Sequence, residues 1–354
     1  MMVRTGFHGG RSMRGFTIVA LMVAVAVSLV VALAAAASLL VGSRRYSTVD
    51  DAAQLRQNAS FVVALVGRIT AQAGFQDVHF ATRSALSADT VSAVPAISGF
   101  NNATVTSTTA TTGDIKINSA NSDTLKVTAW ETGMPGFGSD VLVVRYQPAA
   151  LGAEDPTSDG SMLDCSGAAP GTASVSRDDT SVNVFFVSKD VDDERDGEPA
   201  LSCYSLNADR HTFKRRVSLV RGVENFQVLY GVQAKTPTAN TAFVSSKDAI
   251  PYAYMRADQM VVGNDPHGAA TRRNWQLVRS LRIGLVLRGS VNKQQAAVEQ
   301  VLYPLGLGKS SGAGAAGSAF GSTRDPGSIF NAPADGRFRS AETFTIHLRN
   351  AQGS

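Results

Sequence analysis

Several short motifs in the C-terminal half of the chain could carry chemistry, but none of them is complete. Residues 306–310 read Gly-Leu-Gly-Lys-Ser, the end of a phosphate-binding loop, yet the glycine required five residues before the Gly-Lys-Ser is replaced by Tyr303. The serine in residues 317–321 (Gly-Ser-Ala-Phe-Gly) stands one position too early for the nucleophile elbow of a serine hydrolase. We therefore interpret residues 306–327, which are dominated by Gly, Ser and Ala, as a flexible loop.

A group of acidic residues imitates the first half of a calcium-binding loop. Asp192, Glu194, Asp196 and Gly197 have the required spacing, but the twelfth position, which needs a bidentate glutamate, is Cys203. Two interpretations stay open here. We favour an acidic, solvated turn between two strands, and the alternative is a weak calcium site in an extracellular loop.

The histidines and tryptophans predict no site either. The histidines have no zinc-like spacing to one another or to the cysteines, and we expect them on the surface or on strand faces: His8, His79, His211, His267 and His347. We expect Trp130 and Trp275 in the core or at an interface. No nucleophile, base and orienting group can be named together, so the sequence predicts no catalytic residue, no metal, no cofactor and a non-enzymatic role.

The composition excludes some classes of protein. The chain has 354 residues, of which 44% are hydrophobic and 18% charged, enough to build one large or two modest cores. The net charge is only +4, and the densest cationic clusters are two or three residues long (44–45, 214–216 and 272–273). Because no basic face with stacking or base-reading groups is visible, we expect no direct binding of nucleic acid.

The N-terminal region could anchor the chain in a membrane. Residues 1–15 carry Arg4, Arg11 and Arg14 and no acid, and residues 16–41 carry no charge at all. A stretch of about 20 apolar residues crosses a bilayer, whereas the apolar region of a secretory signal peptide is much shorter. The leading arginines favour a cytoplasmic N-terminus, and the pair at 44–45 weakens that charge bias.

The helical pattern continues beyond the apolar run as a stripe. Its members recur at spacings of four and three: Leu55, Ala59, Val62, Val66, Ile69 and Ala73. Polar residues (Gln54, Asn58, Arg68 and Gln72) fall off this stripe. We predict one helix to about Gly74, with a membrane half over residues 16–41 and an amphipathic half over 42–75 that needs a globular domain to cover one face.

The rest of the chain, residues 76–354, reads as a β-rich exported domain. Apolar residues alternate with polar ones in four segments, around residues 142–146, 182–186, 281–287 and 344–348. Such strands form antiparallel sheets with one face on a core, here the helical stripe, and the other face in water. The polar residues 101–121 indicate irregular surface structure or short edge strands. The predicted fold class is therefore α+β.

Two cysteines, Cys165 and Cys203, lie in this exported region. A small, even count in an oxidising compartment favours one disulfide, and the alternative is two free buried thiols. The disulfide would close a loop of roughly 40 residues, worth about 4 kcal/mol in the chain-entropy model.

The start of the chain resembles a known processing signal. Residues 15–19 (Gly-Phe-Thr-Ile-Val), followed by Leu-Met-Val at 21–23, are similar to the class III signal of type IV pilins and type II secretion pseudopilins. The resemblance implies that a prepilin peptidase removes the leader 1–15, cutting between Gly15 and Phe16, and methylates Phe16. It also implies a type IV pilin-like fold. The family has glutamate as its fifth mature residue, where this chain has Ala20. The carboxylate that would pair with a neighbouring subunit's terminal amine is thus missing.

Later segments resemble the PilW group of minor pilins: residues 55–61, 164–167, 201–203, 223–232, 278–283 and 343–350. This resemblance implies a subunit that primes type IV pilus assembly at the tip. Implied partners are other minor pilins, the major pilin, a tip adhesin, the inner-membrane assembly platform and the prepilin peptidase. It implies one pass through the inner membrane of a Gram-negative bacterium, with the C-terminal domain in the periplasm and later in the pilus. Such pili serve twitching motility, adhesion or DNA uptake. Two alternatives stay open, a tip pseudopilin of type II secretion and a signal-anchored periplasmic enzyme or binding protein.

Overall fold

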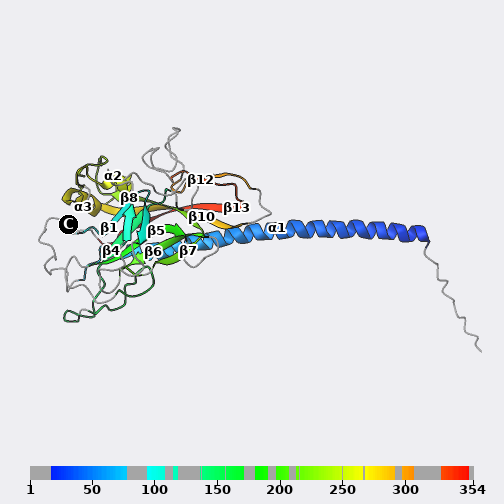
Figure 1. Cartoon of the computed structure of the whole chain (residues 1–354), viewed down its shortest axis with the longest axis horizontal. Helices are drawn as coiled ribbons and strands as arrows, with labels where there is room; N and C mark the ends of the chain where they lie inside the picture. Colours follow the sequence, from blue (N-terminus) through cyan, green and yellow to red (C-terminus); the bar gives the residue numbers. More distant parts are fainter. Residues whose placement is uncertain are drawn as a thin grey trace, which may run out of the picture. The chain divides into compact units, whose positions relative to one another are not determined.

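A computed structural model describes residues 17–77, 94–107, 115–118, 136, 138–155, 157–170, 180–189, 197–206, 213–214, 216–248, 250–265, 268–291, 297–306 and 328–350. Figure 1 shows the elements in chain order. They are α1 (Ile18–Ala71), β1 (Ile97–Phe100), β2 (Thr104–Ser107), β3 (Ile115–Asn118), β4 (Val141–Tyr146), β5 (Ser181–Lys189), β6 (Pro199–Ser205), β7 (Val217–Arg221), β8 (Val223–Val232), β9 (Ala253–Met255), α2 (Ala257–Met260), α3 (Ala269–Gln276), β10 (Val278–Val291), β11 (Gln300–Leu302), β12 (Phe330–Ala332) and β13 (Arg337–His347). The chain divides into two units, Met1–Asp51 and Ala52–Ser354.

The first unit contains the apolar part of α1. The span Ile18–Gly42 has 25 residues and a mean hydropathy of 2.9, so it is long and apolar enough to cross a membrane. Thr17 precedes the helix and caps it, because its Oγ1 accepts a hydrogen bond from the backbone N–H of Ala20 at 3.3 Å. The large apolar side chains of this span are exposed in the chain on its own, which leaves them for lipid or for other helices.

In the second unit, the remainder of α1 buries the predicted stripe. All six of its members are at most 5% exposed: Leu55, Ala59, Val62, Val66, Ile69 and Ala73. Gln54 and Arg68, which fall off the stripe, are exposed. The helix ends at Ala71, slightly before the predicted Gly74, and Gly74 follows with a left-handed φ of 73°. The side-chain amide of Asn350 donates to the carbonyls of Ala71 and Ala73 at 3.5 and 3.0 Å, so the C-terminal part of the chain closes this helix end.

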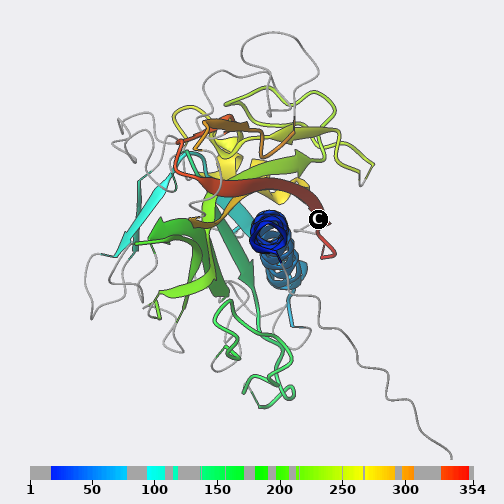
Figure 2. The same ribbon diagram turned by 90° about the vertical axis from the view of Figure 1, so that its right-hand side faces the viewer.

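Two antiparallel sheets make up most of the second unit. The five-stranded sheet has the order β1-β4-β5-β6-β7, and the four-stranded sheet has the order β13-β10-β8-β9. Within the described residues every strand pair is antiparallel. Figure 2 shows strands of both sheets beside the part of α1 that belongs to the second unit. The α+β class with an N-terminal helix on antiparallel sheets is confirmed, and the predicted polar segment 101–121 contains the short hairpin β2–β3.

The main core joins the helix to both sheets. It combines the helical stripe with inward-facing residues of the five-stranded sheet, such as Leu142 and Phe185, and of the four-stranded sheet, such as Phe226 and Ile283. This is the core partner that the alternation predicted for the stripe. Because the helix covers the inner faces of both sheets, the two sheets and α1 depend on one another for burial.

The expectation that each strand has one face in water is wrong for β4 and β5. Val141 and Val143 of β4 and Val184 and Phe186 of β5 form a second buried cluster on the opposite face from the main core. Tyr204 of β6 completes this cluster and stacks on Phe186 with ring centroids 5.4 Å apart. The outer face of this sheet is therefore covered as well, and a period of two cannot show which of two buried faces meets α1.

Candidate functional site

The processing signal lies at the edge of what the structure describes. Gly15 and Phe16 lie outside the described residues, and Ala20 stands on the first turn of α1. The sequence analysis missed Thr17, whose N-cap bond to the Ala20 N–H shows that position 20 is the third helical residue. A glutamate at that position would complete a capping box by reaching back to the N-cap N–H, so Ala20 omits a local helix-start interaction in addition to the intermolecular pair described above.

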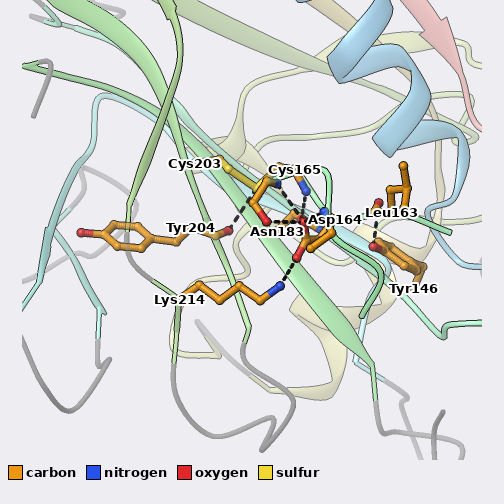
Figure 3. Close-up of a disulfide and its surroundings, with 10 residues drawn as sticks. Tyr146, Leu163, Asp164, Cys165, Asn183, Cys203, Tyr204 and Lys214 are labelled. Atoms are coloured by element: carbon orange, nitrogen blue, oxygen red, sulfur yellow. Dashed lines mark hydrogen bonds and ion pairs between the residues drawn. A yellow bond between two sulfur atoms is a disulfide. The ribbon is translucent and has the colours of Figure 1, made fainter. Parts of the chain in front are cut away.

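The structure joins Cys165 to Cys203, with an S–S distance of 2.08 Å and a Cα–Cα distance of 6.4 Å (Figure 3). Cys203 lies on β6, and Cys165 lies in the segment between β4 and β5. Both are buried in the main core. Of the two interpretations left open by the sequence, this is the disulfide, and it ties the β4–β5 connection to β6 of the five-stranded sheet.

Leu163, two residues before Cys165, holds the same segment to the end of α1. The side-chain amide of Gln72 donates to the carbonyl of Leu163 at 3.0 Å, and its Oε1 accepts the Leu163 N–H at 3.2 Å. The hydroxyl of Tyr146 also donates to the Leu163 carbonyl at 2.9 Å, and burial raises the pKa of Tyr146 to about 12. Cys165 N–H donates to Asn183 Oδ1 at 2.8 Å. We call these residues and the disulfide the Cys165 clamp.

Asp164, between Leu163 and Cys165, forms an ion pair with Lys214 next to the clamp. Its carboxylate accepts hydrogen bonds from the Ser166 and Ala168 backbone N–H groups at 2.9 and 3.0 Å and from Lys214 Nζ at 2.5 Å. Burial alone raises the pKa of Asp164, but the hydrogen bonds from Lys214, Ser166 and Ala168 outweigh it, so the pKa is lowered. The carboxylate is thus charged, paired and buried. The arrangement fixes a loop.

A second charged cluster, which the sequence analysis missed, lies on the other face of the four-stranded sheet. Arg339 is fully buried and donates to Glu224 at 2.6 Å and to Asp335 at 2.6 Å. Among the described residues, the cluster has three cations and three acids: Arg288, Arg337, Arg339, Glu198, Glu224 and Asp335. Hydrogen bonds from Arg339 lower the pKa of Asp335. Burial lowers the pKa of Arg339, but its partners Asp335 and Glu224 outweigh burial, so the pKa of Arg339 is raised. No pattern in the sequence predicts that these six residues meet, because they come from segments that lie far apart in the chain.

The remaining candidates carry no site within the part of the chain that the structure describes. No three His, Cys, Asp or Glu side chains there are grouped to hold a metal. The acidic residues 192–196 and the motifs at 307–310 and 317–321 lie outside it, as do Trp130 and four of the five histidines. His347 is exposed on β13, and Trp275 is buried against Tyr230, with ring centroids 4.8 Å apart.

Comparison with known proteins gives one family match. Residues 184–350 match the model of the type IV pilus-assembly protein W (PilW) family. No curated protein sequence matches the chain. Among solved structures, a type IV-like pilin from Thermus thermophilus is similar over 84% of this chain and 98% of its own, at 10% identity and a TM-score of 0.35, a likeness too low to argue from. The PilW match contains the segments 201–203, 223–232, 278–283 and 343–350 that resembled this family, and it does not depend on the N-terminal signal.

Proposed function

We propose that this chain, a type IV pilin-like protein of the PilW type, is a minor pilin that primes assembly of a type IV pilus and stands at its tip. The observation that carries the proposal is the combination of two independent features. One is the Gly15-Phe16 junction ahead of an uncharged helix, and the other is the PilW match in the C-terminal half. Each feature alone fits more protein classes than the pair does.

The described geometry suits a structural subunit. Exposed apolar side chains of Ile18–Gly42 require lipid before assembly and neighbouring helices afterwards, since water does not solvate them favourably. The stripe beyond Ala52 commits one side of α1 to the chain's own sheets. The Cys165 clamp and the Asn350 amide hold the end of the helix, so a load on α1 is passed to both sheets. In this role the chain catalyses no reaction.

The proposal includes a location and a set of partners. Before assembly the chain crosses the inner membrane of a Gram-negative bacterium once, with residues beyond the span in the periplasm, and afterwards it is part of the pilus. Its partners are other minor pilins, the major pilin, a tip adhesin, the assembly platform and the prepilin peptidase. The PilW match supports contact with pilus components as a class.

Position 20 supports the tip location. A terminal amine and a carboxylate in an apolar setting attract each other by several kcal/mol even at an effective dielectric of about 20. A chain with Ala20 offers no carboxylate to a subunit above it, yet its own amine can receive one from the subunit below. It can therefore be the uppermost subunit without an unpaired buried acid. We expect Ala20→Glu to move the subunit into the shaft; if the unchanged protein is already found along the whole shaft, the tip location is wrong.

The test of the proposal as a whole is processing at Gly15. Gly15→Leu should leave the full-length precursor in the inner membrane and abolish pili or reduce their number. Gly10→Leu, inside the same leader, is the matched control and should be processed normally. Normal processing and assembly of the Gly15→Leu variant would contradict the proposal. Recovery of the intact protein only with type II secretion subunits would assign it to that filament instead.

A further inference from the structure

Strand β13 leaves one side without a partner strand. It is the outermost strand of the four-stranded sheet and pairs, among the described residues, with β10 alone. The Leu348 N–H donates to the Arg279 carbonyl at 2.9 Å, which fixes the phase of the hydrogen bonds along this antiparallel pair. Because these bonds alternate, Thr343, Thr345 and His347 turn their backbone N–H and C=O groups away from β10. All three residues are exposed.

A groove runs between this free edge and α1. It has a volume of about 530 Å³, and its wall on α1 includes Arg56, Val63 and Ala64. Glu342, Thr343 and Phe344 of β13 form the opposite wall. Val63 is 37% exposed and Phe344 is half-buried, so the groove presents apolar surface to solvent beside Thr343, the first of the three residues whose outward backbone groups pair with no described strand. An extended peptide satisfies both features at once, since one edge of it pairs with β13 and every second side chain enters the groove.

The direction of β13 argues against an antiparallel pair of two β13 strands at this edge. The Asn350 amide meets Ala71 and Ala73, whereas Phe344 lies across the groove from Arg56 and Ala64. The strand therefore runs in the same direction as the part of α1 beside it. Two copies paired antiparallel through β13 would form a closed two-fold pair in which the parts of α1 beyond Ala52 point in opposite directions, and such a pair does not extend a filament.

We propose that the free edge of β13 and the groove beside it accept an extended segment of a different subunit of the filament, added to the sheet as a strand. Its alternate side chains are small and apolar where they face Val63 and Phe344. It also carries an acidic residue opposite Arg56, whose guanidinium makes no ion pair with any described residue. The identity of the partner as a filament subunit rests on the proposed function.

The test uses Thr345, whose N–H points to the free edge. Thr345→Pro removes that donor and blocks strand addition but breaks no bond to β10, because proline is tolerated on edge strands whose N–H faces solvent. Thr345→Val is the matched control, since it keeps the N–H and the shape of the side chain. Full-length tagged variants are purified in detergent from pilus-forming cells, and the unchanged protein is also purified from a host without pilus genes. Amide hydrogen exchange is then compared over residues 343–347.

We expect exchange over residues 343–347 to be at least tenfold slower in the complex than in the protein purified alone. Thr345→Pro should lose the partner, and Thr345→Val should keep it. Equal exchange in both preparations overturns the inference, as does retention of the partner by Thr345→Pro. Protection confined to residues 56–64 also overturns it, because that pattern belongs to a helix in the groove. If pilus subunits still co-purify with a chain cut at Gly15, the proposed function survives each of these failures.

Discussion

Removal of the Cys165–Cys203 disulfide should lower the free energy of unfolding by about 4 kcal/mol. The bond joins residues 38 positions apart, and the chain-entropy model gives about 4 kcal/mol for a loop of this length. The non-covalent part of the clamp remains when the disulfide is removed, because the two hydrogen bonds between Gln72 and Leu163 and the ion pair between Asp164 and Lys214 do not involve the cysteines. The loop should therefore keep its folded position, and the loss should arise mainly in the unfolded chain.

The assay is urea unfolding of the full-length protein in detergent, followed by tryptophan fluorescence, because Trp275 is buried. The variant is Cys165→Ala/Cys203→Ala, and the single variant Cys203→Ala should lose nearly as much, since either change opens the loop. Gln72→Ala in the disulfide-bonded protein is the control. It removes two hydrogen bonds from the folded state only, costs about 1–3 kcal/mol, and should add to the effect of the cysteine changes.

Two results would refute this reasoning. A loss below about 1 kcal/mol in the double variant would show that the crosslink does not restrict the unfolded chain as the loop length requires. A double variant that unfolds without cooperativity would show that the disulfide, and not the hydrogen bonds, holds the segment in the folded state.

The charged groups give two further predictions. Arg339→Met should lower the free energy of unfolding by about 3–5 kcal/mol, because it leaves Glu224 buried with one cation fewer. Arg337→Met, at a partly exposed position, should lower it by less than half as much in the same urea assay. Equal losses in the two variants would contradict this account. The lowered pKa values of Asp164 and Asp335 mean that their contribution to stability is present above the unfolded pKa of about 3.9 and is lost as the pH falls through the folded values. The urea midpoint of unfolding should therefore be constant near neutral pH and fall below about pH 4. Asp164→Asn should make that fall shallower. If the midpoint of this variant falls as steeply with pH as that of the unchanged protein, the Asp164 carboxylate does not contribute to stability as an ion pair.

The parts of the fold that the sequence predicted are those with a single period and a single buried face. The helical stripe is one such part, since Leu55 and Ala73 mark its ends and every member is buried. Strand β10 fits only in part, because Leu281 to Leu287 alternate into the main core as expected, whereas Val286 on the opposite face is buried in a separate cluster with Phe330 and Ala332. For the stripe and for this one face of β10, the spacing alone identifies the residues that meet the main core.

The parts that could not be predicted depend on partners far apart in the chain. Val143 reads as an outward-facing residue of β4, and only the packing of Phe186 and Tyr204 shows that its face is covered. No pattern in the sequence pairs Glu224 with Arg339, and they meet because β8, β10 and β13 are neighbours in the sheet. Likewise, a sequence shows no strand edge, because the free side of β13 exists only once the sheet order is known.

The measurement that tests the central claim most directly is the mass of the mature N-terminus, taken on full-length protein from the cells that make it. Cleavage after Gly15 predicts a chain that begins at Phe16 and carries one additional methyl group on its amine. A chain that begins at Met1 or Met2 would contradict the claim, because it would make the apolar helix a plain signal anchor.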